Sequence, residues 1–127
     1  MNLILIAAGG ATGALLRFLF VGASMRLFGS SFPYGTLGVN IVGSFLMGAA
    51  AFAVLRGELL SSYEPFRLFM MTGLLGGFTT FSAFSLDTIN LIEAGRVGDA
   101  MLYIVGSVTL SIFALVLGMM CVRAVQG

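Results

Sequence analysis

The chain contains no histidine and no lysine, and Cys121 is its single cysteine. Without histidine, the histidine-containing zinc sites and the Ser–His and Cys–His nucleophile pairs are excluded. A single cysteine cannot form a disulfide within the chain, and its place in an apolar run is typical of packing. The sequence therefore lacks the residues on which many familiar enzymes depend.

Charge is scarce as well. Charged residues make up 9% of the 127 residues, against roughly 25% in an ordinary soluble domain. Hydrophobic residues make up 59%, and the mean hydropathy is +1.10. A soluble core cannot hide so much apolar surface in so short a chain, so the composition predicts an integral membrane protein. The net charge of +1 provides no basic field for a nucleic-acid partner.

Four apolar runs reach the length of about 20 residues that a helix needs to cross a bilayer. Connectors rich in glycine, proline, serine or charge separate them. The N-terminus has no positive segment, so we expect it to be mature membrane sequence. We expect residues 1–127 to form a single four-helix membrane domain, all α, with spans at about Asn2–Leu27, Gly35–Leu55, Pro65–Ile92 and Asp99–Arg123.

The basic residues, which orient membrane proteins, are almost evenly divided between the two sides. One alternative is a single, weakly biased orientation. The other is dual topology, in which two oppositely inserted copies form an antiparallel homodimer with its two-fold axis in the membrane plane. The predicted spans place Arg56, Arg67 and Arg123 on one side and Arg17, Arg26 and Arg96 on or near the other.

The third span carries the most informative stretch, "GLLGGFTTFSAFSLD" from Gly73 to Asp87. The Gly76–Gly77 pair weakens a helix within an apolar run. Broken helix at membrane depth is tolerated only where protein or a water-filled cavity covers the freed backbone groups, and transporters use such breaks to bind ions. We therefore predict that the helix breaks at this pair. The alternative is that the two glycines only allow a close helix crossing.

Beyond the glycines, an aromatic stripe and a hydroxyl stripe run side by side. Phe81 and Phe84 share one helical face, and Ser82 and Ser85 share the next. Positive ring edges and hydroxyl donors both suit an anion that is losing its water. A phenylalanine pair alone would be typical of lipid or core packing, but the adjacent hydroxyls favour a conduction path.

Other polar residues in the spans have two interpretations each. Asn40 either bonds a neighbouring helix or lines a pore. Asp87 is functional if it is buried, or hydrated if it lies near the interface. Arg17 either extends to the headgroups or attracts anions at a pore mouth. The Gly9–Gly13 and Gly73–Gly77 pairs allow close helix approach, either within one subunit or between two.

At these residues the sequence resembles the Fluc, or CrcB, family of fluoride channels. The third-span motif, "PYGTLGVN" before the second span and "GGATGALLR" in the first carry the resemblance over essentially the whole chain. It implies a dual-topology homodimer in the lipid of the bacterial inner membrane, with two antiparallel fluoride pores. It also implies a structural Na⁺ at the dimer interface and passive export that relieves fluoride toxicity.

The resemblance also implies roles for individual residues. Arg17 would lie near the aqueous vestibule, and the backbone carbonyls of Gly76 and Thr79 would bind Na⁺ from both subunits. The pore would be lined by Asn40, Thr80, Phe81, Ser82, Phe84, Ser85 and Tyr103. Two positions depart from the family pattern. Ala83 replaces a threonine, which removes one hydroxyl, and Asp87 replaces a glutamate, which shortens the carboxylate by one methylene.

Other functions remain possible from the residues alone. A small dual-topology multidrug or guanidinium exporter would share the size and charge balance, but it would couple to protons through a glutamate in a first span that here has no acid. A non-transporting accessory subunit would share the composition. An enzyme is disfavoured, because Asp87, Glu93 and Asp99 form no evident pair with a base.

Overall fold

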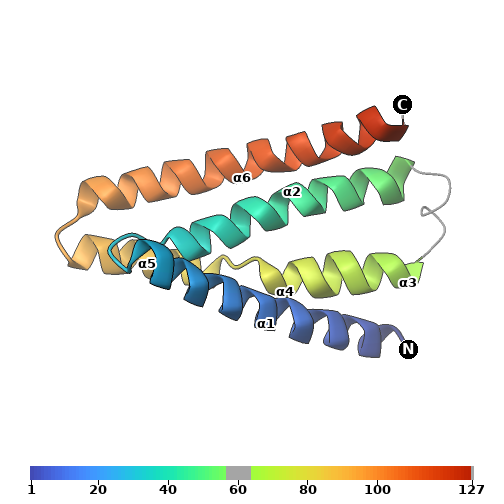
Figure 1. Ribbon diagram of the computed structural model, residues 1–127, viewed down its shortest axis with the longest axis horizontal. Helices are drawn as coiled ribbons and strands as arrows, with labels where there is room; N and C mark the ends of the chain where they lie inside the picture. Colours follow the sequence, from blue (N-terminus) through green and yellow to red (C-terminus); the bar gives the residue numbers. More distant parts are fainter. Residues whose placement is uncertain (57–63, 127) are drawn as a thin grey trace.

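The computed structural model describes residues 1–56 and 64–126, which form helices running alternately up and down along one long axis (Figure 1). The amino and carboxyl ends lie at the same end of the bundle. In chain order the elements are α1 (Asn2–Phe28), α2 (Tyr34–Arg56), α3 (Glu64–Arg67), the π-helix η1 (Leu68–Leu75), α4 (Gly76–Phe78), α5 (Ser82–Glu93) and α6 (Val97–Gln126).

These elements make four helical segments long and apolar enough to cross a membrane, and their bounds are close to those predicted. They cover Asn2–Phe28, Tyr34–Val54, Glu64–Glu93 and Val97–Val125. Helices suit this composition because each backbone amide finds its partner within the segment, where no water is present. The prediction of a four-helix membrane protein is confirmed, and so is the prediction that its third span is broken.

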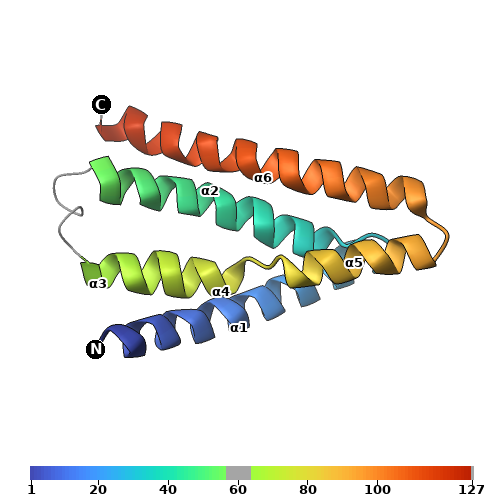
Figure 2. The ribbon, with the colours of Figure 1, turned by 180° about the vertical axis from the view of Figure 1, so that it is seen from behind.

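The third span is helical on both sides of a short extended segment. Figure 2 shows this segment between α4 and α5, with α1 beside one half and α2 beside α6. The half that precedes the segment begins with α3 and continues as the π-helix η1, a form that is rare and frequently found at functional sites. One predicted membrane span is thus built from two shorter helical pieces.

Glycines set the closest helix crossings. A Cβ atom placed on Gly77 would lie 2.6 Å from the carbonyl oxygen of Gly10, and one on Gly73 would lie 2.9 Å from that of Ile6. A Cβ on Gly73 would also lie 3.0 Å from the Cα of Gly9, so the glycines of the first and third spans let these two helices pack closely within one subunit. Gly48 and Gly118 bring α2 and α6 into similar backbone contact. Without an apolar driving force between helices in lipid, such close packing holds the bundle together.

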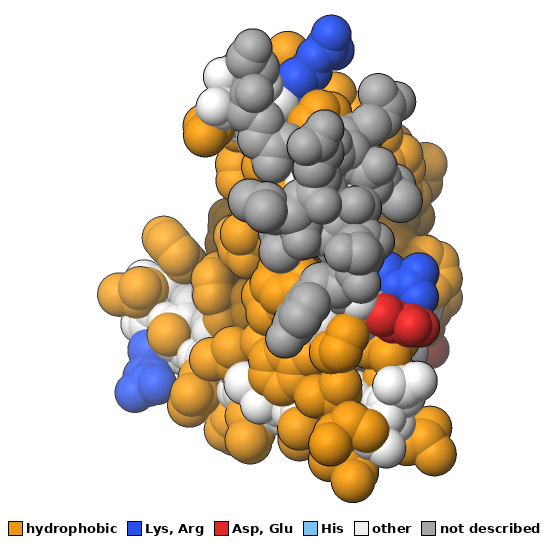
Figure 3. Space-filling model, turned by 90° about the vertical axis from the view of Figure 1, so that its right-hand side faces the viewer, with side chains coloured by type: hydrophobic (Ala, Val, Ile, Leu, Met, Phe, Trp, Pro, Cys, Tyr) orange, Lys and Arg blue, Asp and Glu red, His pale blue; other side chains and the backbone are white. Residues whose placement is uncertain are grey.

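Few side chains are buried within the subunit. The core cluster consists of Phe84, Leu91, Ala100 and Tyr103, with Phe32, Leu37 and Ile104 packed against it. Large apolar side chains such as Phe18, Leu102 and Ile112 are exposed. In the view of Figure 3 the described side chains are likewise mostly hydrophobic, and charged side chains are few. Such a surface fits lipid or a further protein chain, not water.

Candidate functional site

The break in the third span is held open by a side chain from another helix. Thr79 adopts an extended conformation, with φ −84° and ψ 158°. Asn40 of α2 donates from Nδ2 to the carbonyl oxygen of Thr80 at 2.9 Å, and its Oδ1 accepts from the Thr80 amide at 2.8 Å. The carboxamide thus satisfies both backbone groups of Thr80, as a neighbouring β-strand would. Backbone groups freed by a helix break at membrane depth have no water to bond, and the Asn40 side chain supplies the missing partners for Thr80.

The hydrogen bonds around the break leave two carbonyl oxygens without their usual helical donors. The amide of Thr80 would ordinarily donate to Gly76, four residues earlier, but it donates to Asn40. The amide of Ala83 would ordinarily donate to Thr79, but it donates to the Thr80 hydroxyl oxygen at 3.2 Å. The carbonyls of Gly76 and Thr79, the pair predicted to bind Na⁺, are therefore released from the helical ladder.

The prediction that Gly76 and Gly77 break the helix is wrong in its position. Both glycines are helical and belong to α4, and the extended segment begins at Thr79. Gly77 instead packs on the backbone of Gly10, so the alternative interpretation, a close crossing, is correct for this residue. At the break the Thr80 backbone groups bond the Asn40 side chain, which belongs to another helix.

A cavity of about 240 Å³, called here the central cavity, opens beside the break. It brings together Asn40, Thr80, Phe81 and Phe84 of the predicted pore lining. Its remaining lining residues are Ser44, Thr79, Ser107, Val108 and Ser111. Apart from the backbone, its polar groups are one amide and several hydroxyls, and none of the described residues that line it is charged.

Three of the hydroxyls in the central cavity were not predicted as site residues. Ser107 is 5% exposed, and its Oγ has no hydrogen-bond partner among the described residues. A buried hydroxyl normally has a partner, so this atom is available to a ligand. Helical spacing was the signal, since Ser44 lies four residues after Asn40 and Ser111 four after Ser107, which places each pair on one face.

The two phenylalanines form the aromatic wall of this cavity. The Phe81 and Phe84 ring centroids lie 5.5 Å apart, with the ring planes at 50°. Phe84 is buried at 9% exposure, whereas Phe81 is 75% exposed on the surface of the subunit. Phe84 therefore belongs to the subunit core. Phe81 lines the cavity and in addition faces outward from the subunit, toward lipid or a second protein chain.

Ser82 and Ser85 do not line the central cavity. Both are exposed on α5, and the Ser85 hydroxyl donates back to the Phe81 carbonyl at 3.1 Å. The structure therefore separates the predicted hydroxyl stripe from the hydroxyls of the cavity, which come from α2, the break and α6. Arg17 likewise lines neither the central cavity nor the end cavity described next.

Tyr103 links the central cavity to a second one at the end of the bundle. Its ring is buried, with its centroid 5.1 Å from that of Phe84, and its hydroxyl donates to Asp87 Oδ2 at 3.1 Å. Asp87 lines a cavity of about 300 Å³, called here the end cavity, between α5 and the turn that joins α1 to α2. Phe84, Tyr103 and Asp87 thus form a continuous series from one cavity to the other.

Comparison with known proteins identifies the family of this chain. The family model described as CrcB-like protein, Camphor Resistance (CrcB), matches residues 4–119. The chain belongs to the CrcB family. Three bacterial members carry the name fluoride-specific ion channel FluC. The Agrobacterium fabrum protein is 51% identical over 94% of each chain. The Cereibacter sphaeroides protein is 52% identical over 96% of this chain and 94% of its own. The Rhodopseudomonas palustris protein is 45% identical over 98% and 99%.

Membership of the CrcB family confirms the predicted resemblance. It also answers the question of class, because relatives across nearly the full length are named as channels and not as enzymes. With four segments able to span a bilayer, the chain is a multi-pass membrane protein. The first span, Asn2–Phe28, contains no acidic residue, so it lacks the glutamate on which the proton-coupled exporter alternative depends.

Proposed function

We propose that this chain is a passive, fluoride-selective channel that lets fluoride leave the cell and so relieves its toxicity. The observation that carries the proposal is the central cavity, where the buried, unpartnered Ser107 hydroxyl lies with the Asn40 amide beside two aromatic rings. The names of the CrcB-family relatives, which cover nearly the whole chain, support fluoride as the ion.

The chemistry of the central cavity suits a small, strongly hydrated anion. Hydroxyl and amide hydrogens replace water as donors, and the edges of aromatic rings carry partial positive charge. A fixed cation would hold fluoride too tightly, whereas several weak donors allow both entry and exit. Asn40 uses one N–H on Thr80, and a primary amide has a second to offer. No single residue then carries the whole cost of dehydration.

The contacts of Tyr103 suggest the direction of the pathway. Phe84 lines the central cavity, packs on Tyr103, and Tyr103 bonds Asp87 in the end cavity. We infer that fluoride moves between the two cavities past these three side chains. Val39 and Ala100, which are fully buried, belong to the packing around the pathway and provide no donor side chain.

The proposal includes an antiparallel homodimer of dual topology. Phe81 and the Ser82–Ser85 face are exposed on one subunit, which is difficult to reconcile with a pore lining unless a second copy covers them. The arginines on the helices support insertion in both orientations. Arg67 and Arg123 lie at the end that carries the termini, and Arg26 and Arg96 lie at the other. Two copies would provide two pores.

The membrane proposed for this assembly is the bacterial inner membrane.

A structural Na⁺ at the dimer interface is part of the same proposal. The released carbonyls of Gly76 and Thr79 are oxygen ligands of the kind that unwound membrane helices offer to Na⁺. Gly76 is exposed on the subunit surface, where a second copy can reach it. Two carbonyls are too few for one ion, so the second copy would supply the others. Bound there, the ion would tie the two breaks together without entering the pathway.

Purified protein in liposomes tests the proposed function. Liposomes loaded with fluoride or with chloride are diluted into a solution without either, and an ion-selective electrode follows efflux. Rapid loss of fluoride with retention of chloride is expected. Fluoride efflux that requires or drives proton movement, read with a pH dye, would favour the coupled exporter, and silent liposomes would favour an accessory subunit.

A further inference from the structure

The end cavity is polar at its rim and lies directly over the Tyr103–Asp87 pair. It is enclosed by the end of α1, the turn that follows it, the start of α2 and one face of α5. Of the described residues that line it, Arg96 carries the positive charge and Asp87 the negative. Arg96 lies at the edge of this cavity, close to the end of the proposed pathway.

Arg96 is held in place by the turn between α5 and α6. Gly95 has a φ of 80°, and the amides of Gly95 and Arg96 donate to the carbonyls of Ile92 and Leu91 at 3.0 and 2.9 Å. This is the Schellman arrangement that ends many helices, and it needs glycine at the left-handed position. The backbone of Arg96 is therefore fixed relative to α5, which carries Asp87.

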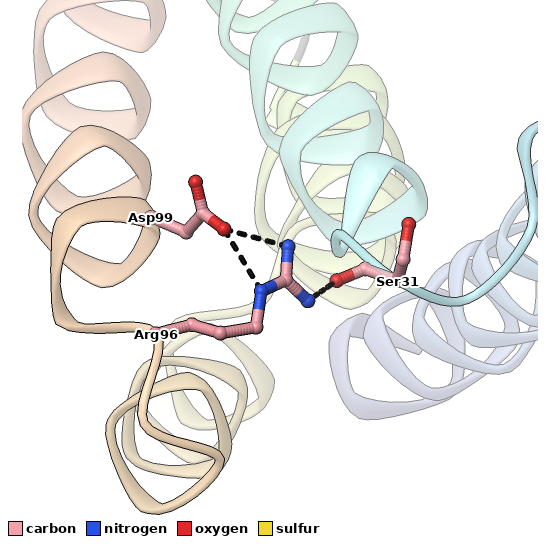
Figure 4. Close-up of polar contacts among 3 residues, drawn as sticks. All are labelled: Ser31, Arg96 and Asp99. Carbon is pink, nitrogen blue, oxygen red and sulfur yellow. Dashed lines mark hydrogen bonds and ion pairs between the residues drawn. The ribbon is translucent and has the colours of Figure 1, made fainter.

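From this position the Arg96 side chain reaches across the rim of the end cavity (Figure 4). Nε and Nη2 donate to Asp99 Oδ2 at 2.8 and 2.7 Å, and Nη1 donates to the carbonyl oxygen of Ser31. The two side chains of the ion pair are 36% and 43% exposed. A pair this accessible to solvent adds little to stability, so stability alone is a weak reason for the arrangement.

The charges at the rim have a direct consequence for an approaching anion. Asp87 and Asp99 carry two negative charges, and Arg96 carries the positive charge that offsets one of them. We propose that the end cavity is the outer mouth of the conduction pathway and that the Arg96–Asp99 pair sets its electrostatic potential, with Arg96 drawing fluoride in. This inference rests on the proposed function and adds to it a residue that determines ion entry.

The two partners of the pair should act in opposite directions. Arg96→Gln leaves two carboxylates unopposed, so fluoride is repelled, whereas Asp99→Asn leaves the guanidinium free to attract it. A unit charge about 8 Å from an ion in water changes its local concentration about two-fold. The effect should be present at about 0.01 M salt, where the screening length is about 30 Å, and absent at about 1 M, where it is about 3 Å.

Single-channel fluoride conductance in planar bilayers tests this, because it is measured per channel and does not depend on the folded fraction. At low ionic strength Arg96→Gln should lower the conductance about two-fold and Asp99→Asn should raise it by a similar factor. Both should match the wild type in high concentrations of an impermeant electrolyte. Arg96→Lys, which keeps the positive charge, should stay close to wild type.

If the Arg96–Asp99 ion pair had only a structural role, the two substitutions should change the conductance in the same direction, because each breaks the same ion pair. Changes of the same sign in Arg96→Gln and Asp99→Asn, or changes that persist in high salt, would overturn the proposal. So would an unchanged conductance in both variants. A wild type that carries no fluoride current would instead contradict the proposed function itself, and the two failures are therefore distinguishable.

Discussion

Replacing Asn40 by alanine tests the contact that holds the third span open. The substitution removes two hydrogen bonds to the Thr80 backbone, at 2.8 and 2.9 Å. Thr80 is buried, with 9% of its surface exposed. A typical intramolecular hydrogen bond contributes about 1 kcal/mol, and a buried group left without any partner costs about 1–3 kcal/mol. The adjacent central cavity of about 240 Å³ allows water to replace the lost amide, so the smaller value applies to each group. We expect the free energy of unfolding to fall by about 2 kcal/mol.

The measurement is unfolding of the purified protein in detergent by a denaturing surfactant, followed by the helical signal in far-ultraviolet circular dichroism. Asn90→Ala is the matched control, because Asn90 is an exposed asparagine on α5 and its loss should change stability by less than about 0.5 kcal/mol. Fluoride flux should also fall in Asn40→Ala, because the cavity loses its amide donor. Asn40→Ala as stable as Asn90→Ala would refute the role of the carboxamide in the break.

Three further predictions concern the aromatic wall, the helix crossings and the unpartnered hydroxyl. Phe81→Ile and Phe84→Ile should each reduce fluoride efflux from liposomes while size-exclusion chromatography shows unchanged assembly; unchanged efflux in both would remove the role of the ring edges. Gly77→Ala should lower the free energy of unfolding by about 1–3 kcal/mol through overpacking against α1, whereas Gly106→Ala, where a Cβ meets open space, should raise it by up to about 1 kcal/mol; equal effects would contradict the crossing. Ser107→Ala should leave stability unchanged and lower fluoride flux, and undiminished flux would exclude this hydroxyl as a ligand.

The spans were predictable because their lengths are imposed by the bilayer. The predicted end at Leu27 and the observed end at Phe28 differ by one residue, and the third span, predicted as Pro65–Ile92, is observed as Glu64–Glu93. Hydropathy alone carries this information, since every helix that crosses lipid must satisfy its own backbone over a fixed thickness. The glycine pairs could also be recognised in the sequence, but the residues that they contact in the neighbouring helix could not.

The position of the break was not predictable from local sequence. Helix propensity indicated Gly76 and Gly77, but the extended segment lies where Asn40, 40 positions before Thr80, bonds the Thr80 backbone. A contact this distant in sequence does not influence any local measure of helix stability. The four-residue spacing of Ser107 and Ser111 was available, but the direction in which their helical face points depends on the packing of α2 against α6.

The outward position of Ser82 and Ser85 has a similar explanation. Their spacing correctly predicts that they share a face of α5, and both are exposed. The rotation of that helix is set by the burial of Phe84, Thr88 and Leu91 on the opposite side, which a three-residue periodicity alone does not determine. A role in conduction for these two serines therefore depends on the proposed second copy of the chain.

We propose that the cavity beside the break belongs to a passive pathway that admits fluoride and rejects chloride. The most direct test is the zero-current voltage of the reconstituted protein in a planar bilayer, with independent gradients of fluoride, chloride and protons. We expect this voltage to follow the fluoride gradient as the Nernst relation requires for a single permeant anion, and the chloride and proton gradients to leave it unchanged. A zero-current voltage that moves with the chloride or the proton gradient would contradict it.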